Sequence, residues 1–438
     1  MYIISNVNNF FKALVNRNKP KLVNAFFMYF MFAFTADQLV NYFVHVPVFV
    51  VAALAIFPLL ILFVLHKNHG KLQLIVFILS FILIAVINNA VYGLHKKNIS
   101  DLLFICLFAA FYYLYRNRTG YLKVGFVYAF FFIFLALFSF TFLSINSGSV
   151  FKTTSTLSID STSVAQAKPL SDTITPASEP IQWENNPRLD YVEYLRLYHN
   201  GLFRLPHMAS YFFGFLSLFF IYRFWKNKKI IELVLFAISL IVCVYTGSRA
   251  VIAAFFLSGI LFLLKRKYIV YLQSIIIAAL LITLGIEHIL RFTEGTVFYQ
   301  YFSIIQTTTE NITRLSRFRI WYSWWIEISN FGIWDFLMGK SYINAHMANI
   351  KNLNYDIWFH NDFLNIFFSY GIWATILYIG LFVKIYSDNK TYIKTNFFIF
   401  IYYFSMLITA IINGFYYYFP IFLLYLFWLM INEEKQTT

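Results

Sequence analysis

Three short polar sequences border the apolar runs of this chain, and each contains groups that bind anions or transfer protons. The first is Thr246-Gly247-Ser248-Arg249, which lies between two apolar runs with almost no loop on either side. An arginine at a membrane boundary, beside a glycine that lets a ligand approach the backbone, suits an anionic headgroup. An arginine that caps a span and extends toward the lipid headgroups has the same spacing. Both interpretations of Ser248 and Arg249 therefore stay open.

The second polar sequence contains Arg314, Arg317 and Arg319. Guanidinium groups bind phosphate through paired hydrogen bonds and keep their charge at any relevant pH. At helical spacing Arg314, Arg317 and Trp321 share one face, which predicts an amphipathic helix over residues 314–329 at the membrane surface. A phosphate site is one interpretation of these arginines, and a basic helix lying on anionic lipid is the other.

The third polar sequence is His360-Asn361-Asp362, where a long hydrophilic stretch meets an apolar run. A histidine can accept a proton from a hydroxyl group near neutral pH, and a neighbouring carboxylate can orient its ring. Structural histidines are nevertheless common, and His199-Asn200 repeats the dipeptide elsewhere in the chain. The dipeptide alone does not decide between a catalytic and a structural role.

Several other kinds of site have no counterpart in the sequence. It has no GxxxxGK[ST] phosphate loop, no HExxH motif and no cluster of Cys and His. The carboxylates outside the apolar runs are not paired in the way that a divalent ion requires. We therefore expect no metal and no cofactor.

The composition identifies a membrane protein. Of the 438 residues 60% are hydrophobic and only 12% are charged, and the mean hydropathy is +0.67. No water-soluble fold covers so much apolar surface, which excludes a soluble enzyme, a secreted scaffold and a disordered chain. The net charge of +15 lies mostly in short clusters between apolar runs, as expected of cytoplasmic loops and not of a nucleic-acid-binding face. Cys106 and Cys243 lie inside apolar runs and are expected to be small buried hydrophobes.

About twelve apolar runs approach the roughly 20 residues that a spanning helix needs. They cover residues 22–43, 46–65, 72–94, 101–115, 122–143, 207–224, 230–246, 248–264, 268–286, 361–384, 392–413 and 414–432. Cationic residues between positions 12 and 21 precede the first run without the pattern of a cleavable signal, so we expect a cytoplasmic N-terminus. An even number of spans returns the C-terminus to the cytoplasm. The loop with Lys96 and Lys97 is the exception to the charge rule.

Two long hydrophilic loops then fall on the outer side of the membrane. They divide the chain into five regions: helices one to five (1–143), a first loop (144–206), helices six to nine with the Ser-Arg sequence (207–286), a second loop (287–360) and the last three helices (361–438). Residues 152–180 of the first loop are rich in Ser and Thr, which predicts a flexible tether.

Four sequences in the second half of the chain occur in a familiar order. They are NGLFRLPHMASYFFGF from Asn200, YTGSRAVIAAFFLSGILFLL from Tyr245, SRFRIW from Ser316 followed by Gly339, and HNDFLNIFFSYGIWATILYIGLF from His360. In order, spacing and outer placement they resemble the O-antigen ligase and O-antigen polymerase superfamily, bacterial membrane glycosyltransferases that join lipid-linked glycans. The resemblance covers about residues 200–385. One departure is Ala250, where the family usually has glycine.

The resemblance implies a fold and a set of roles. The fold would be all-α, a polytopic membrane protein with about twelve transmembrane helices, two large periplasmic loops and a GT-C-like architecture. Arg249 and Arg317 match the positions that hold the donor pyrophosphate, and His360 matches the general base. The second loop would be the catalytic one. Secondary candidates for substrate binding are Ser248, Arg314, Arg319 and Asn361.

The resemblance also implies a reaction and its partners. A glycan on undecaprenyl pyrophosphate would be transferred to a glycan acceptor at the periplasmic face of the bacterial inner membrane, with inversion and without metal. Membrane lipid and a chain-length regulator are further expected partners. A polymerase is favoured, because the chain is rich in aromatic residues and divergent outside the motifs. A ligase that uses lipid A core as acceptor is the alternative. A lipid-linked oligosaccharide flippase is a second alternative, against which the long loops and the lack of similar halves count.

Overall fold

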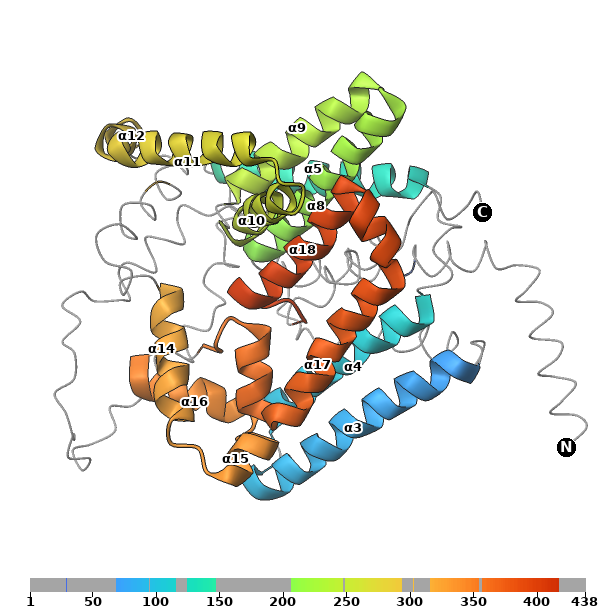
Figure 1. Ribbon diagram of the computed structural model, residues 1–438, viewed down its shortest axis with the longest axis vertical. Coiled ribbons are helices and arrows are strands. Elements are labelled where there is room, and N and C mark those ends of the chain that lie inside the picture. Colours follow the sequence, from blue (N-terminus) through green and yellow to red (C-terminus); the bar gives the residue numbers. More distant parts are fainter. Residues whose placement is uncertain are drawn as a thin grey trace, which may run out of the picture.

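The computed structural model describes residues 68–93, 95–115, 124–146, 206–246, 249–293, 316–353 and 357–416, together with Tyr29 and Phe302. Throughout these ranges the chain forms α-helices and short connections, with no strand, which confirms the all-α prediction (Figure 1). The helices are α3 (Asn68–Tyr92), α4 (Lys96–Tyr115), α5 (Val124–Asn146), α8 (Pro206–Asn227), α9 (Ile230–Tyr245), α10 (Arg249–Lys265), α11 (Ile269–Leu284), α12 (Ile286–Thr293), α14 (Ser316–Ile328), α15 (Ile333–Met338), α16 (Tyr342–Leu353), α17 (Asp362–Thr395) and α18 (Phe397–Ile412).

Three of these helices are long and apolar enough to cross a membrane. They contain the segments Leu72–Tyr92, His207–Asn227 and Asp362–Thr395. A fourth span results if α11 and α12, which meet at a bend of 68°, are counted together. Shorter apolar helices, which do not reach spanning length, lie within several other expected spans, whereas 46–65, most of 22–43 and most of 414–432 lie outside the described residues. The helices indicate a membrane protein, and the number of twelve spans stays a prediction.

Two expected boundaries differ from the structure. The apolar run expected to end at residue 384 continues as helix to Thr395, because the polar residues of the last turns extend the helix beyond its hydrophobic part. Residues 287–293, expected to begin the second outer loop, lie in helix α12 (Ile286–Thr293), whose Ile286 and Leu290 are buried one turn apart. In both places helical backbone continues where apolar composition stops.

Helices α14, α15 and α16 gather at one end of the molecule, beside the start of α17 (Figure 1). A small core holds α14 and α16 against α17, formed by Ile320, Ala345, Ala348, Phe359 and Phe368. The amphipathic helix expected over 314–329 is present as α14, and its Phe318, Tyr322 and Trp325 side chains are exposed. Much of the second loop is therefore a helical cap on the ends of the long helices.

The cap is joined to α17 through two glycines. Gly371 interrupts α17 with a φ of 77°, and Gly339, just after α15, has a φ of 74°. A Cβ atom on Gly371 would lie 2.2 Å from the carbonyl oxygen of Leu337, and one on Gly339 would lie 2.4 Å from the backbone nitrogen of Tyr370. Only glycine allows this approach of backbone to backbone.

Backbone groups at the interruption find partners in the segment that crosses it. The N–H of Lys340 donates to the carbonyl of Phe368 (2.7 Å) and the N–H of Ser341 to that of Ser369 (3.0 Å). The buried amide of Asn88 in α3 donates to the carbonyls of Gly339 (3.1 Å) and Ser369 (3.0 Å). A polar residue near the end of an apolar helix is thus explained by backbone carbonyl groups that lie beside it at the break in α17.

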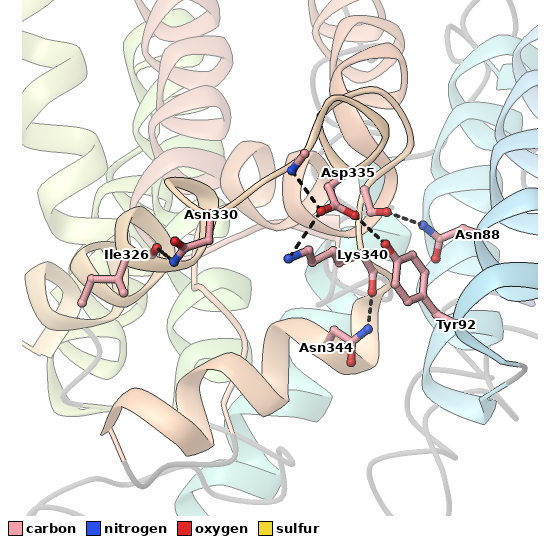
Figure 2. A network of polar contacts seen from close by, with 9 residues as sticks. Asn88, Tyr92, Ile326, Asn330, Asp335, Lys340 and Asn344 are labelled. Carbon is pink, nitrogen blue, oxygen red and sulfur yellow. Dashed lines mark hydrogen bonds and ion pairs between the residues drawn. The ribbon is translucent and has the colours of Figure 1, made fainter. Parts of the chain in front are cut away.

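Asp335 anchors α15 to the end of α3 (Figure 2). Its carboxylate accepts a hydrogen bond of 2.6 Å from the Tyr92 hydroxyl and lies 3.5 Å from the ammonium group of Lys340. It also accepts from the N–H of Gly332, which begins α15 (3.2 Å). One carboxylate therefore fixes a six-residue helix that has little buried surface of its own.

Replacement of Gly371 by alanine is expected to destabilise the protein. The positive φ alone costs about 1–3 kcal/mol for a residue with a side chain, and the overlap with Leu337 adds to it. Gly380→Ala is the matched control in the same helix, because no atom lies within 4 Å of its Cβ position. Thermal unfolding in detergent micelles should show a lower midpoint for Gly371→Ala and an unchanged or higher one for Gly380→Ala. Equal midpoints would contradict the structural role of the interruption.

Candidate functional site

Residues from four helices converge around the side chain of Asn413, at the end of α18. The Arg317 guanidinium of α14 donates to the Asn413 Oδ1 atom. The Asn413 Nδ2 group donates to the hydroxyl of Tyr211 in α8, and the Tyr211 ring is stacked on that of His207, with centroids 6.4 Å apart. Arg249 at the start of α10 acts electrostatically on the same His207, as does Arg317. Two arginines chosen from separate motifs thus lie at one site.

His360 belongs to the same cluster. Arg317 and His207 both act on it electrostatically, and Asn413 lies near its ring. The ring packs against Trp358, with centroids 5.2 Å apart. Its backbone has a φ of 51°, a left-handed conformation in which histidine is more frequent than most residues. The structure therefore places Arg317 beside His360, and Arg249 is connected to this pair through His207.

The surroundings of His360 favour its neutral form. Burial lowers its pKa well below the usual 6.5, and the positive charge of Arg317 and the electrostatic interaction with His207 lower the pKa further, against a smaller opposing effect of Asn413. Neither ring nitrogen makes a hydrogen bond of normal geometry within the described part of the chain. A neutral imidazole has a lone pair that can accept a proton, although the lowered pKa makes this ring a weaker base than a free histidine.

Asp362 does not orient His360, contrary to the expectation from sequence. Its carboxylate accepts hydrogen bonds from the Tyr378 hydroxyl (2.7 Å) and from the backbone N–H groups of Phe415 (2.8 Å) and Tyr416 (3.3 Å). Because these two N–H groups follow α18, Asp362 fixes the turn that carries Asn413. The carboxylate supports the site through the backbone and not through the histidine ring.

Asn361 has a structural role at the start of α17. Its Oδ1 atom accepts from the N–H groups of Phe363 (3.0 Å) and Leu364 (3.1 Å), so it is the N-cap of α17. Such a cap contributes about 1 kcal/mol to stability. The cap fixes the first turn of α17 and, with it, the backbone on which His360 stands.

The remaining candidates are placed as follows. Arg319 is half-buried on α14. Residues two positions apart in an α-helix are separated by about 200° around its axis, so Arg319 lies on another side of α14 from Arg317. Ser248 and Arg314 lie outside the described residues. Cys243 is buried, as expected, and Cys106 packs against the core with partial exposure.

Sequence reasoning missed three members of the cluster: His207, Tyr211 and Asn413. His207 begins a long apolar helix and Asn413 ends a shorter one. A signal was present, because polar groups at the ends and in the interior of apolar runs are candidates for function. Asn413-Gly414 lies at the boundary between two expected spans, where it is easily taken for a loop.

No known protein family, no curated protein and no solved structure matches this chain. Among the described residues no three His, Cys, Asp or Glu side chains are grouped as a metal site would require. The resemblance to the polymerase and ligase superfamily accordingly depends on the four motifs.

The lowered pKa of His360 predicts a specific dependence of stability on pH. The folded protein resists protonation of this ring, whereas the unfolded chain takes up the proton near pH 6.5. Above pH 6.5 this histidine does not lower the free energy of unfolding. As the pH falls from 6.5 toward the pKa of the folded state, the free energy of unfolding decreases by up to about 1.4 kcal/mol per pH unit. In detergent, acidification from pH 7.5 to 5.5 should lower the unfolding midpoint less in His360→Gln than in the unmodified protein. The same loss in both would contradict the burial of a neutral histidine.

Proposed function

We propose that this protein is a glycosyltransferase of the O-antigen polymerase and ligase type, which transfers a glycan from undecaprenyl pyrophosphate to a glycan acceptor. One observation carries the proposal: Arg249, Arg317 and His360 come from motifs far apart in the sequence and meet around His207 and Asn413. Two permanent cations beside a neutral base suit a reaction in which an anion leaves and a hydroxyl loses its proton.

The proposed reaction is a single displacement at the anomeric carbon of the donor sugar. The acceptor oxygen forms a bond to this carbon while the bond to the pyrophosphate oxygen breaks, which inverts the configuration. The Arg249 and Arg317 guanidinium groups stabilise the negative charge that develops on the pyrophosphate. The neutral His360 ring takes the proton of the acceptor hydroxyl, a contribution of typically about 10²–10⁴-fold. These residues require neither a metal ion nor a nucleotide.

The proposal includes a topology. With a cytoplasmic N-terminus and twelve spans, the start of α8, the start of α10, the start of α17 and the end of α18 all face the periplasm of a bacterial inner membrane. His207, Arg249, Asp362 and Asn413 lie at these four helix ends. The alternating direction of the helices thus agrees with one common outer site. Within the family a polymerase, acting with a chain-length regulator, is preferred to a ligase.

Replacement of Arg249, Arg317 or His360 by alanine in the native host should lower formation of surface polysaccharide at least about 100-fold, because each variant removes transition-state stabilisation or the base. Arg266→Ala is the control, an exposed arginine whose guanidinium lies over Phe262 at the other end of α10. Gel electrophoresis of the polysaccharide provides the readout. Normal ladders in all three variants would overturn the catalytic assignment.

The same gel separates the related activities. Core capped with a single repeat identifies a polymerase, whereas core without repeats, together with accumulated lipid-linked polymer, identifies a ligase. A flippase is recognised with purified protein and lipid-linked donor, since it leaves the mass of the donor lipid unchanged. Growth of the glycan in that assay supports the transferase.

A further inference from the structure

Asn413 contacts both the cationic and the aromatic part of the site. Its side chain is fully buried, and both of its polar atoms are engaged: Oδ1 accepts from Arg317 and Nδ2 donates to the Tyr211 hydroxyl. A guanidinium has donors and no acceptor, so the amide oxygen must face Arg317. The orientation of the amide is therefore fixed by the chemistry of its two neighbours.

The backbone around Asn413 is held as firmly as its side chain. Its N–H donates to the carbonyl of Thr409 (3.0 Å), which ends α18. Gly414 follows with a φ of 78°, and a Cβ there would lie 1.8 Å from the Trp358 ring. Asp362 then binds the N–H groups of Phe415 and Tyr416. The site-facing amide thus has a defined position relative to α17 as well as to α8 and α14.

An amide at this place has a different effect from a carboxylate. Both offer an oxygen to the guanidinium, but a carboxylate would form an ion pair with Arg317 and compensate the charge that an anionic ligand needs. An amide fixes the direction of the guanidinium and adds no charge. The same side chain lies beside His360, so a negative charge there would also act on the base.

We propose that Asn413 is a positioning residue, which directs Arg317 toward an anionic pyrophosphate group and adds no negative charge of its own beside that guanidinium. The inference rests on the proposed function, because it takes the ligand to be a pyrophosphate. It concerns a residue that touches the binding arginine and not the reacting atoms.

Inorganic pyrophosphate is a suitable probe, with its dissociation constant measured by calorimetry on the full chain in detergent. Asn413→Ala should weaken binding about tenfold, since Arg317 loses its orientation. Asn413→Asp keeps an oxygen for Arg317 but should weaken binding about 100-fold or more, because it adds a negative charge. Asn330→Asp, an exposed position after α14, is the control for charge alone and should bind as the unmodified protein does.

A merely structural role predicts the opposite order. Asn413→Asp would then be the milder change, since it preserves the hydrogen bond to Arg317, and affinity would follow the unfolding midpoint. Binding by Asn413→Asp that equals or exceeds that of Asn413→Ala overturns the proposal. Should Asn413→Asp fail to fold, Asn413→Ala decides: unchanged affinity overturns the proposal, and a tenfold loss at an unchanged unfolding midpoint supports it.

The controls distinguish the inference from the proposed function. Both proposals fail if the unmodified protein does not bind pyrophosphate. They also fail if Arg249→Ala and Arg317→Ala bind pyrophosphate as tightly as the unmodified protein does. If binding depends on both arginines but not on Asn413, only the inference fails.

Discussion

The contact between the backbones of Gly339 and Gly371 is the constraint on which the rest of the described structure depends. It breaks α17, places the helical cap over the break, and brings the carbonyl groups of Gly339 and Ser369 to the amide of Asn88 in α3. Because the first turns of α17 are fixed to the cap, His360 and Asp362 have defined positions. Asp362 in turn holds the end of α18, which carries Asn413 to Arg317. A steric requirement at two residues therefore extends to the chemistry of the site.

Composition and motif order predicted much of this arrangement. The apolar runs predicted an all-helical membrane protein, and the helical spacing after Arg314 predicted α14. The chemistry of Arg249, Arg317 and His360 and their positions in the four motifs predict a common site, and their functional roles stay a prediction. Gly339 and Gly371 both belong to the motifs, but their contact joins segments whose packing no local pattern specifies.

Side-chain partners could not be predicted from the sequence where the two residues lie far apart in the chain. Asp362 is two residues from His360 in the sequence, yet it binds backbone groups more than fifty residues away. Glu232, a buried carboxylate in the first turn of α9, likewise has its partners on other helices: Arg223 (3.0 Å) in α8 and Tyr128 (2.7 Å) in α5. For Asp362, closeness in the sequence suggested a partnership that does not exist.

The interruption at Gly371 divides one long helix into two mechanical parts. Residues 362–370 are fixed to the cap, whereas residues 372–395 carry the greater part of the hydrophobic length. A spanning helix adjusts its tilt when the thickness of the bilayer changes, and a hinge between the two parts confines that adjustment to the second. We expect the distances among His360, Arg317 and Asn413 to be insulated from the thickness and composition of the surrounding lipid, although the site lies at the end of a membrane helix.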